Sequence, residues 1–281
     1  METSIEGTAD IQGVSLHYAC SGVGEPVLLI SGLGASAEMW ARQAAAFESN
    51  HTVIRFDNRG AGRSDTPEGP YSIQAMASEA VQLLDALDIP AAHVVGASMG
   101  GMIAQEVAIQ YPDKALSLTL IAAQCGGPHA FVPAQESAAA LQELATLDMT
   151  PQERARGWVP YTLSTGFREA SPDLVEDYTR ISALHPPSTE GLRAQWAALM
   201  SYDSWERLES VAAPTLVLQG SADLLVPVEN ADVLGVRIPD ARVEILDGVG
   251  HSVAFEAADS VNPLMLEFFA EHRYQADEPE D

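Results

Sequence analysis

A chain of 281 residues, 47% of them hydrophobic, can bury one large core, and a single α/β domain that carries an insertion fits that length. Its formal net charge of −26 results from 40 acidic against 14 basic residues, and Lys114 is the only lysine. A negative excess of this size argues against nucleic acid and anionic membrane surfaces as partners.

The N-terminal residues, the lengths of the apolar runs and the cysteines predict a cytoplasmic protein. The first ten residues contain neither the basic stretch nor the apolar run of a secretory signal peptide. No apolar segment approaches the roughly 18 residues needed to span a bilayer. Cys20 and Cys125 lack the spacing of metal ligands or of a redox pair, so we expect two buried thiols.

The N-terminal part of the chain predicts an antiparallel hairpin followed by a strand of a parallel sheet. Strands over Thr3–Ala9 and Val14–Ser21 are joined by a polar turn at residues 10–13, which contains a glycine. The apolar run Val27–Ile30 shows no alternation, which is typical of a strand that is covered on both faces.

Helices and strands then alternate as far as residue 122. Apolar residues recur at helical spacing over Ser72–Leu87, so one stripe of that helix faces a core, and Pro90 follows its end. The alternation predicts a doubly wound, mainly parallel sheet, which is an α/β fold. The other elements are helices over Met39–Phe47 and Met99–Tyr111 and strands over Thr52–Phe56, His93–Val95 and Leu116–Ala122.

Between residues 126 and 210 no strand-like run appears, and we interpret this segment as a helical cap inserted into the sheet domain. Thr150 is followed by Pro151 and Glu153 in the pattern of a capping box, and Ser171-Pro172 repeats the first half of that pattern. Beyond it we expect strands over Pro214–Gly220 and Ala241–Leu246 and helices over Val228–Val236 and Val261–Glu271. The predicted division is a core of residues 1–125 and 211–275, a cap of residues 126–210 and an acidic tail of residues 276–281.

An apolar strand runs directly into Gly96-Ala97-Ser98-Met99-Gly100 and from there into a helix. Gly96 and Gly100 stand where a side chain would collide with the backbone of so sharp a turn, which leaves the Ser98 hydroxyl exposed. A serine hydroxyl is a weak nucleophile at neutral pH. It therefore needs a general base within hydrogen-bond reach and an acid that orients this base.

The base is predicted to be His251, one of seven histidines. It follows the last predicted strand, so it lies at the carboxyl edge of the sheet together with Ser98. His93 begins the strand that leads to Ser98, at the opposite edge, and we interpret it as structural.

The predicted acid is Asp223, because it follows the strand that ends at Gly220 and so lies at the same edge. Asp57 and Asp247 are the alternatives. Asp57 also follows a strand, but it precedes the serine and is accompanied by Arg59, which we interpret as its structural partner. Asp247 is so close to His251 in sequence that the chain would have to bend back to reach the ring.

These motifs resemble the landmarks of the α/β-hydrolases over nearly the whole chain except the cap. In chain order the matching stretches are residues 31–34, 57–64, 96–101, 220–223 and 250–251. The order serine, acid, histidine is the one that this family uses, which implies a triad of Ser98, Asp223 and His251. The resemblance also implies an oxyanion hole made by the backbone N–H groups of Leu33 and Met99. Ser31 departs from the family, which usually has a histidine there.

The elbow serine is similar to that of the esterase, enol-lactonase and cofactor-free perhydrolase branches, whereas the dehalogenases and epoxide hydrolases of this fold have an aspartate. We therefore predict a serine hydrolase that cleaves a small-molecule carboxylic ester or lactone through an acyl-enzyme, without metal or organic cofactor. One alternative is an enol-lactonase or C–C bond hydrolase with the same triad, and another is a non-catalytic ligand receptor.

Two further expectations concern the cap and the surface. The cap aromatics either line an apolar pocket above Ser98 or form the core of the cap. Charged residues interrupt any long apolar lid, so we expect small or medium acyl groups to be preferred. The charge and the 13 arginines resemble the surfaces of proteins from salt-loving organisms, and the alternative is an acidic enzyme from a GC-rich genome. The cap aromatics are Trp158, Tyr161, Phe167, Tyr178, Trp196 and Tyr202.

Overall fold

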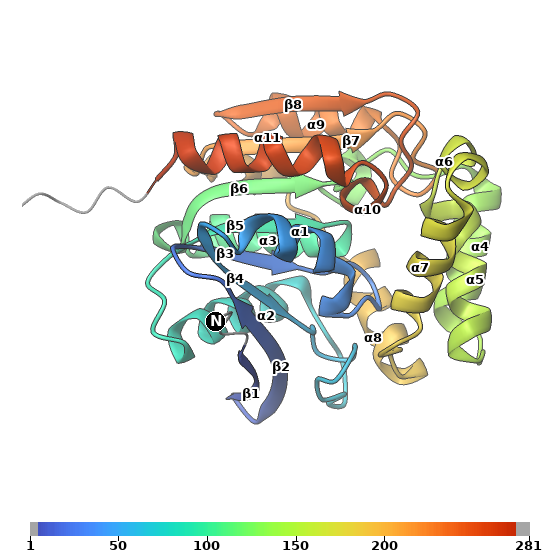
Figure 1. Ribbon diagram of the computed structural model, residues 1–281, viewed down its shortest axis with the longest axis horizontal. Coiled ribbons are helices and arrows are strands. Elements are labelled where there is room, and N and C mark those ends of the chain that lie inside the picture. The colour runs from blue at the N-terminus through green and yellow to red at the C-terminus, as the bar shows by residue number, and fades with distance from the viewer. Residues whose placement is uncertain (1–4, 274–281) are drawn as a thin grey trace, which may run out of the picture.

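The computed structural model describes residues 5–273 and contains one sheet with helices on both faces (Figure 1). Its strands are β1 (Ile5–Ile11), β2 (Val14–Ser21), β3 (Glu25–Ile30), β4 (His51–Phe56), β5 (Ala92–Ala97), β6 (Ala115–Ile121), β7 (Thr215–Gly220) and β8 (Ala241–Leu246). They lie in the order β1-β2-β4-β3-β5-β6-β7-β8. The β1–β2 and β2–β4 pairs are antiparallel and the other pairs are parallel. The predicted fold class is confirmed, while residues 3 and 4 of the predicted first strand lie outside the described residues.

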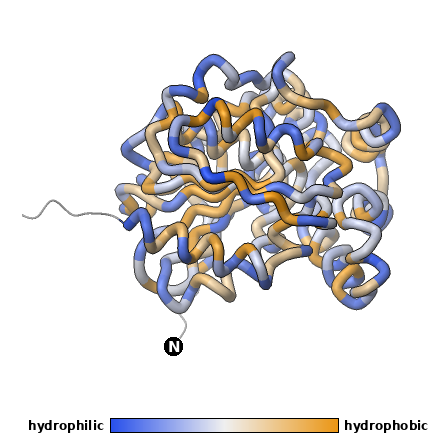
Figure 2. Tube along the Cα trace, turned by 90° about the horizontal axis from the view of Figure 1, so that it is seen from above, coloured by the Kyte–Doolittle hydropathy of each residue, from blue (hydrophilic) through white to orange (hydrophobic). Residues whose placement is uncertain are grey.

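Two apolar layers form because successive side chains of a strand point to opposite faces of the sheet. Neighbouring residues of β5 show this, since Val94 packs in one layer and Val95 in the other. Figure 2 shows the apolar residues concentrated along the central strands. One layer is covered by α1 (Ala41–Phe47), α10 (Val253–Glu256) and α11 (Ala258–Glu271), and the other by α2 (Ile73–Ala86), α3 (Met99–Gln110) and α9 (Glu229–Arg237).

The segment of residues 126–210 is helical and lies at the end of the sheet where β6 and β7 terminate (Figure 1). Its α-helices are α4 (Gln135–Thr146), α5 (Pro151–Thr162), α6 (Thr165–Ala170), α7 (Pro172–Ser182) and α8 (Thr189–Met200). The predicted capping box opens α5, because Thr150 and Glu153 satisfy each other's backbone N–H groups. Pro172 begins α7 as expected, but the Ser171 side chain makes no capping hydrogen bond.

Two details differ from the sequence-based expectation. The closing helix begins at Ala258, three residues earlier than predicted, and the short α10 precedes it. Cys125 is buried, but Cys20 is only partly buried because it lies near the end of β2. Burial raises the pKa of both thiols to about 11. The predicted acidic tail lies outside the described residues, and within residues 5–273 no helix is long and apolar enough to cross a membrane.

Candidate active site

The turn around Ser98 is sharp enough that only glycine fits on both sides. A Cβ atom at Gly96 would collide with the carbonyl oxygen of Gly100, and one at Gly100 would collide with the carbonyl oxygen of Ile30. Ser98 itself has a φ of 54°, a conformation that is costly for a residue with a side chain. The sharp turn places Ser98 between β5 and α3, where its side chain lines a cavity.

Asp223 and His251 are brought together at the same edge of the sheet. His251 Nδ1 lies 2.8 Å from Asp223 Oδ2, and the Asp223 carboxylate is fully buried. The other oxygen, Oδ1, accepts the backbone N–H groups of Leu225 at 2.8 Å and Val226 at 2.9 Å. Gln219 Nε2 also donates to Oδ2, at 2.9 Å. Four hydrogen bonds thus fix the carboxylate against the imidazole.

The two alternative acids have other partners. Asp57 is buried and accepts the N–H groups of Ala37 at 2.6 Å and Arg63 at 2.8 Å, so it ties two loops together. Asp247 accepts a hydrogen bond from the Ser221 hydroxyl at 3.1 Å. Neither carboxylate is paired with His251.

The predicted pairing of Arg59 with Asp57 is wrong. Arg59 forms a bidentate ion pair with Glu79: its Nε lies 2.8 Å from Oε1 and 2.9 Å from Oε2, and its Nη2 also donates to Oε1. Glu79 lies on α2, which the sequence pattern could not orient toward this loop. The arginine beside Asp57 is Arg63, whose Nε lies 3.5 Å from the carboxylate.

His93 lies at the amino edge of the sheet, in β5, and is completely buried. Its Nδ1 is 2.8 Å from the Ser117 hydroxyl, and its ring stacks on Phe269 with 4.6 Å between centroids. Burial lowers the pKa of His93 to about 4, with hydrogen bonding to Glu25 acting in the opposite direction. These contacts lie among the strands and α11 rather than at the cavity.

The loop after β3 passes directly over the nucleophile. A Cβ atom at Gly32 would lie 3.3 Å from Ser98 Cβ and 3.9 Å from Ser98 Oγ. Leu33 follows in this loop and lines the cavity. Met99 opens α3, and the first N–H groups of a helix have no carbonyl partner within the helix. The Ser31 side chain turns to its own loop, where it donates to the Ser36 carbonyl oxygen at 3.3 Å.

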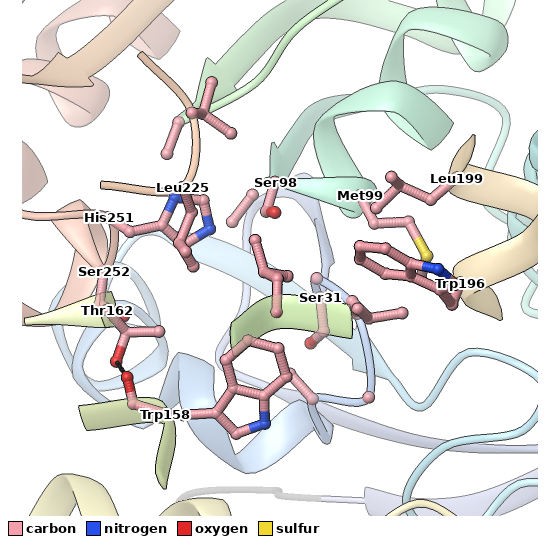
Figure 3. Close-up of a pocket in the computed structure, with 18 of the residues that line it drawn as sticks. Ser31, Ser98, Met99, Trp158, Thr162, Trp196, Leu199, Leu225, His251 and Ser252 are labelled. Atoms are coloured by element: carbon pink, nitrogen blue, oxygen red, sulfur yellow. Dashed lines mark hydrogen bonds between the residues drawn. The ribbon is translucent and has the colours of Figure 1, made fainter. Parts of the chain in front are cut away.

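A cavity of about 590 Å³ lies between the ends of the strands and the helical segment. Figure 3 shows Ser98 and His251 on one side of it, with Trp158 and Trp196 on the opposite wall and at the flank. Of the six predicted cap aromatics, four line the cavity: Trp158, Tyr178, Trp196 and Tyr202. Phe167 instead packs against Phe255, so the two interpretations of the cap aromatics each apply to part of the set.

The helical segment also holds the backbone around His251, and no pattern in the sequence indicates these contacts. The Ser252 N–H donates to the Thr162 carbonyl oxygen at 2.8 Å, and the Ser252 hydroxyl lies 2.9 Å from the Tyr178 hydroxyl. Burial raises the pKa of Tyr178, so its hydroxyl is a neutral partner. The Ser164 N–H donates to a Glu256 carboxylate oxygen at 2.9 Å.

Within residues 5–273, no group of three or more His, Cys, Asp or Glu side chains could hold a metal ion.

Comparison with known proteins gives consistent matches over most of the chain. A family model described as alpha/beta hydrolase fold matches residues 25–258. The protein called "Putative carbamate hydrolase RutD" in Azorhizobium caulinodans is 30% identical over 275 residues, which cover 91% of this chain and 95% of that protein. The 3-oxoadipate enol-lactonase 2 of Acinetobacter baylyi is 33% identical over 244 residues, with coverages of 85% and 88%. The crystal structure of the enol-lactonase from Burkholderia xenovorans LB400 matches with a TM-score of 0.83 at 25% identity and covers 94% of this chain and 100% of that chain.

Proposed function

This chain belongs to the alpha/beta hydrolase fold family, and from that premise we propose that it is a serine hydrolase that cleaves a carboxylic ester or lactone. One observation carries the proposal. Ser98 stands on a strained turn in the same cavity as His251, whose other face is held by a buried carboxylate 2.8 Å from Nδ1. A nucleophile, a base and an orienting acid are the parts that acyl transfer needs.

In the proposed reaction His251 Nε2 removes the Ser98 proton while Oγ attacks the ester carbonyl carbon. Asp223 keeps the proton of the imidazole on Nδ1 and stabilises the imidazolium that forms. The carbonyl oxygen becomes an oxyanion, which the backbone N–H groups of Leu33 and Met99 stabilise. The protonated His251 then gives its proton to the leaving alcohol, and an acyl-enzyme remains. Water attacks this ester by the same route and releases the carboxylic acid.

The second candidate is an enol-lactonase or C–C bond hydrolase that uses the same residues, and the enol-lactonase named among the relatives favours its first form. A carbamate is a further carbonyl substrate that the name of another relative suggests. All of these reactions pass through attack on a carbonyl carbon, so the substrate has to be found by measurement. We propose residues 126–210 as the cap that selects it, because its helices supply most of the wall opposite Ser98.

A substrate panel tests this function. The panel contains p-nitrophenyl esters, simple lactones, an enol-lactone and an aryl carbamate, each measured with the wild-type chain and with Ser98→Ala. We expect multiple turnovers of at least one ester or lactone, and their loss in the variant. Binding without turnover by the wild-type chain would favour the receptor alternative.

A further inference from the structure

A side chain from the helical segment holds the loop that contains Leu33. Gln195 lies in α8 and is completely buried. Its Oε1 accepts a hydrogen bond from the Gly34 N–H at 2.8 Å, and its Nε2 donates to the Arg59 carbonyl oxygen at 2.7 Å. These partners are 161 and 136 residues away in the sequence. An amide that is paired at both ends has one orientation, because reversing it would leave two buried polar groups unpaired.

Within the loop, the Ala35 N–H donates to the Gly32 carbonyl oxygen at 3.2 Å, which closes a turn around Leu33 and Gly34. Groups of the core support the two ends of the loop. Asn58 Nδ2 donates to the Ser31 carbonyl oxygen at 2.9 Å, and the Ala37 N–H donates to Asp57 Oδ1 at 2.6 Å. Gln195 contacts the loop between these points, at Gly34, which has a φ of +66°. The peptide that joins Leu33 to Gly34 therefore lies at the tip of this turn, and the side chain that binds its N–H group comes from α8 rather than from the sheet.

Helix α8 meets the core at backbone contact, so Gln195 is not on a loosely packed surface. A Cβ atom at Gly191 would collide with the Gly60 carbonyl oxygen. One at Gly34 would lie only 2.8 Å from Leu192 Cδ1. Packing this close fixes the distance between the helix and both loops, because an interior at this density has no room for adjustment.

We propose that Gln195 is a positioning residue for the reaction: it orients the Leu33–Gly34 peptide so that the neighbouring Leu33 N–H points at the oxyanion. The inference rests on the proposed function, since it assigns a role in the same site. Removing one oxyanion donor costs hydrolases about 10²–10³-fold in kcat, and a donor that is misaligned rather than absent should cost less. The helical segment is thereby part of the catalytic machinery and not only a wall of the cavity.

The test compares Gln195→Met, which keeps the length of the side chain and removes both hydrogen bonds, with the wild-type chain. We expect kcat to fall by about 10–100-fold while KM changes by less than about threefold, because the donor acts on the transition state. Affinity for a trifluoromethyl ketone, which adds to the serine as an oxyanion, should weaken by a similar factor. Gln195→Asn, a milder change that keeps a buried amide with a shorter reach, is measured beside it in case the methionine variant does not fold.

Thr66→Val is the matched control. It removes the hydrogen bond of 3.2 Å between the Thr66 and Ser188 hydroxyls, which joins the core to the start of α8 without involving the Leu33 loop. We expect kcat and ketone affinity to be unchanged in this control. Normal kcat in a folded Gln195 variant, or a loss shared equally by the control, would overturn this inference and leave the proposed function intact. A wild-type chain without turnover would contradict the proposed function and this inference together.

Discussion

The sheet core and the helical segment of residues 126–210 are stabilised in different ways. Strand residues such as Val94 and Val95 are completely buried between helices of the two faces. The buried members of the apolar cluster beside the helical segment are Leu163, Tyr178 and Phe255, and Phe255 belongs to α10 of the core. The helical segment therefore depends on the core for part of its own packing.

This contrast assigns different tasks to the two regions. Ser98 follows the buried strand β5 and Asp223 follows the buried strand β7, whereas His251 follows β8, the partly exposed strand at the edge of the sheet. Trp158 and Trp196 stand on helices that face them across the cavity. Substitutions in the core should therefore change the rate of bond cleavage, and most substitutions in the segment should change which substrate is cleaved. Gln195 is the proposed exception, and the following predictions test the rule.

The largest effect should come from Ser98→Ala. Because the members of a triad act as a unit, we expect kcat to fall by roughly 10³–10⁶-fold, and by a similar factor in His251→Ala. The melting temperature should stay within about 2 °C of the wild type, since neither change opens a cavity in the core. Thermal unfolding of each variant serves as the control. A loss of less than tenfold would show that Ser98 is not the nucleophile.

Asp223→Asn should cost less, about 10²–10⁴-fold in kcat, because the base remains but its tautomer and orientation are no longer fixed. Asp247→Asn is the matched control, as Asp247 also lies at this edge and bonds to Ser221 instead. Asp57→Asn should reduce stability more than rate, since Asp57 ties loops together. If either alternative aspartate proved more important for kcat at equal stability, the assignment of the acid would be wrong.

The sequence predicted most of the core because local constraints act there. Gly96 and Gly100 are required by the backbone of the turn, and the apolar runs of the strands follow from burial on both faces. The same logic failed for Arg59, whose partner Glu79 depends on how α2 is rotated against a loop. Pairing of charges across elements leaves no periodic signal.

The helical segment was predictable in type but not in contacts. The capping box at Thr150 is a local pattern, and α5 begins there. Gln195 carries no such mark, because a glutamine inside an amphipathic helix is ordinary and its two partners lie more than 130 residues away. The hydrogen bond between the Ser252 and Tyr178 hydroxyls also has no pattern in the sequence that would predict it. Contacts of this kind become visible only when the segment is placed on the core.

A third prediction concerns the length of the acyl group of the substrate. We expect the highest rate among p-nitrophenyl esters from acetate to palmitate at a short or medium chain, without activation at an oil interface. Trp158→Ala should enlarge the cavity and raise the rate of longer esters, relative to that of shorter ones, by about tenfold. Trp205→Ala is the matched control, since Trp205 stacks on His129 outside the cavity lining. A maximum at palmitate with interfacial activation would contradict the prediction.

Acid should weaken the core through His93. The histidine faces Glu25, Ser117, His51 and His272, and burial lowers its pKa from 6.5 to about 4. The unfolded chain therefore takes up the proton first as the pH falls. The stability that neutral His93 contributes is complete well above pH 6.5 and is lost between pH 6.5 and about 4, a change of about 3 kcal/mol.

Urea unfolding at pH 7.5, 6 and 5 measures this dependence. His93→Gln should lose less stability than the wild type over that range, because it has no proton to take up. His129→Gln is the control, because His129 stacks on Trp205 and does not contact His93, and its stability should fall with pH as in the wild type. Identical pH slopes in the wild type and His93→Gln would show that His93 does not contribute.

The smallest effect we expect is that of salt on both regions together. The net charge is −26, and the helical segment shares in it with 12 acidic and 6 basic residues. Like charges repel each other across the surface, and molar salt reduces the screening distance to about 3 Å. The melting temperature should therefore rise by about 5 °C between 0.1 and 2 M KCl.

One cooperative transition is expected at each KCl concentration, because the packing of the helical segment includes Phe255 of the core. Circular dichroism reports the helices. Tryptophan fluorescence reports mainly the segment, which contains Trp158, Trp196 and Trp205, whereas the fourth tryptophan, Trp40, is buried in the core. Sucrose at matched water activity is the control, since it stabilises compact states without screening charge. A melting temperature that stays flat or falls with KCl would reject adaptation to salt. Two separate transitions at low KCl would show that the segment unfolds by itself, and the dependence of its packing on the core would then be wrong.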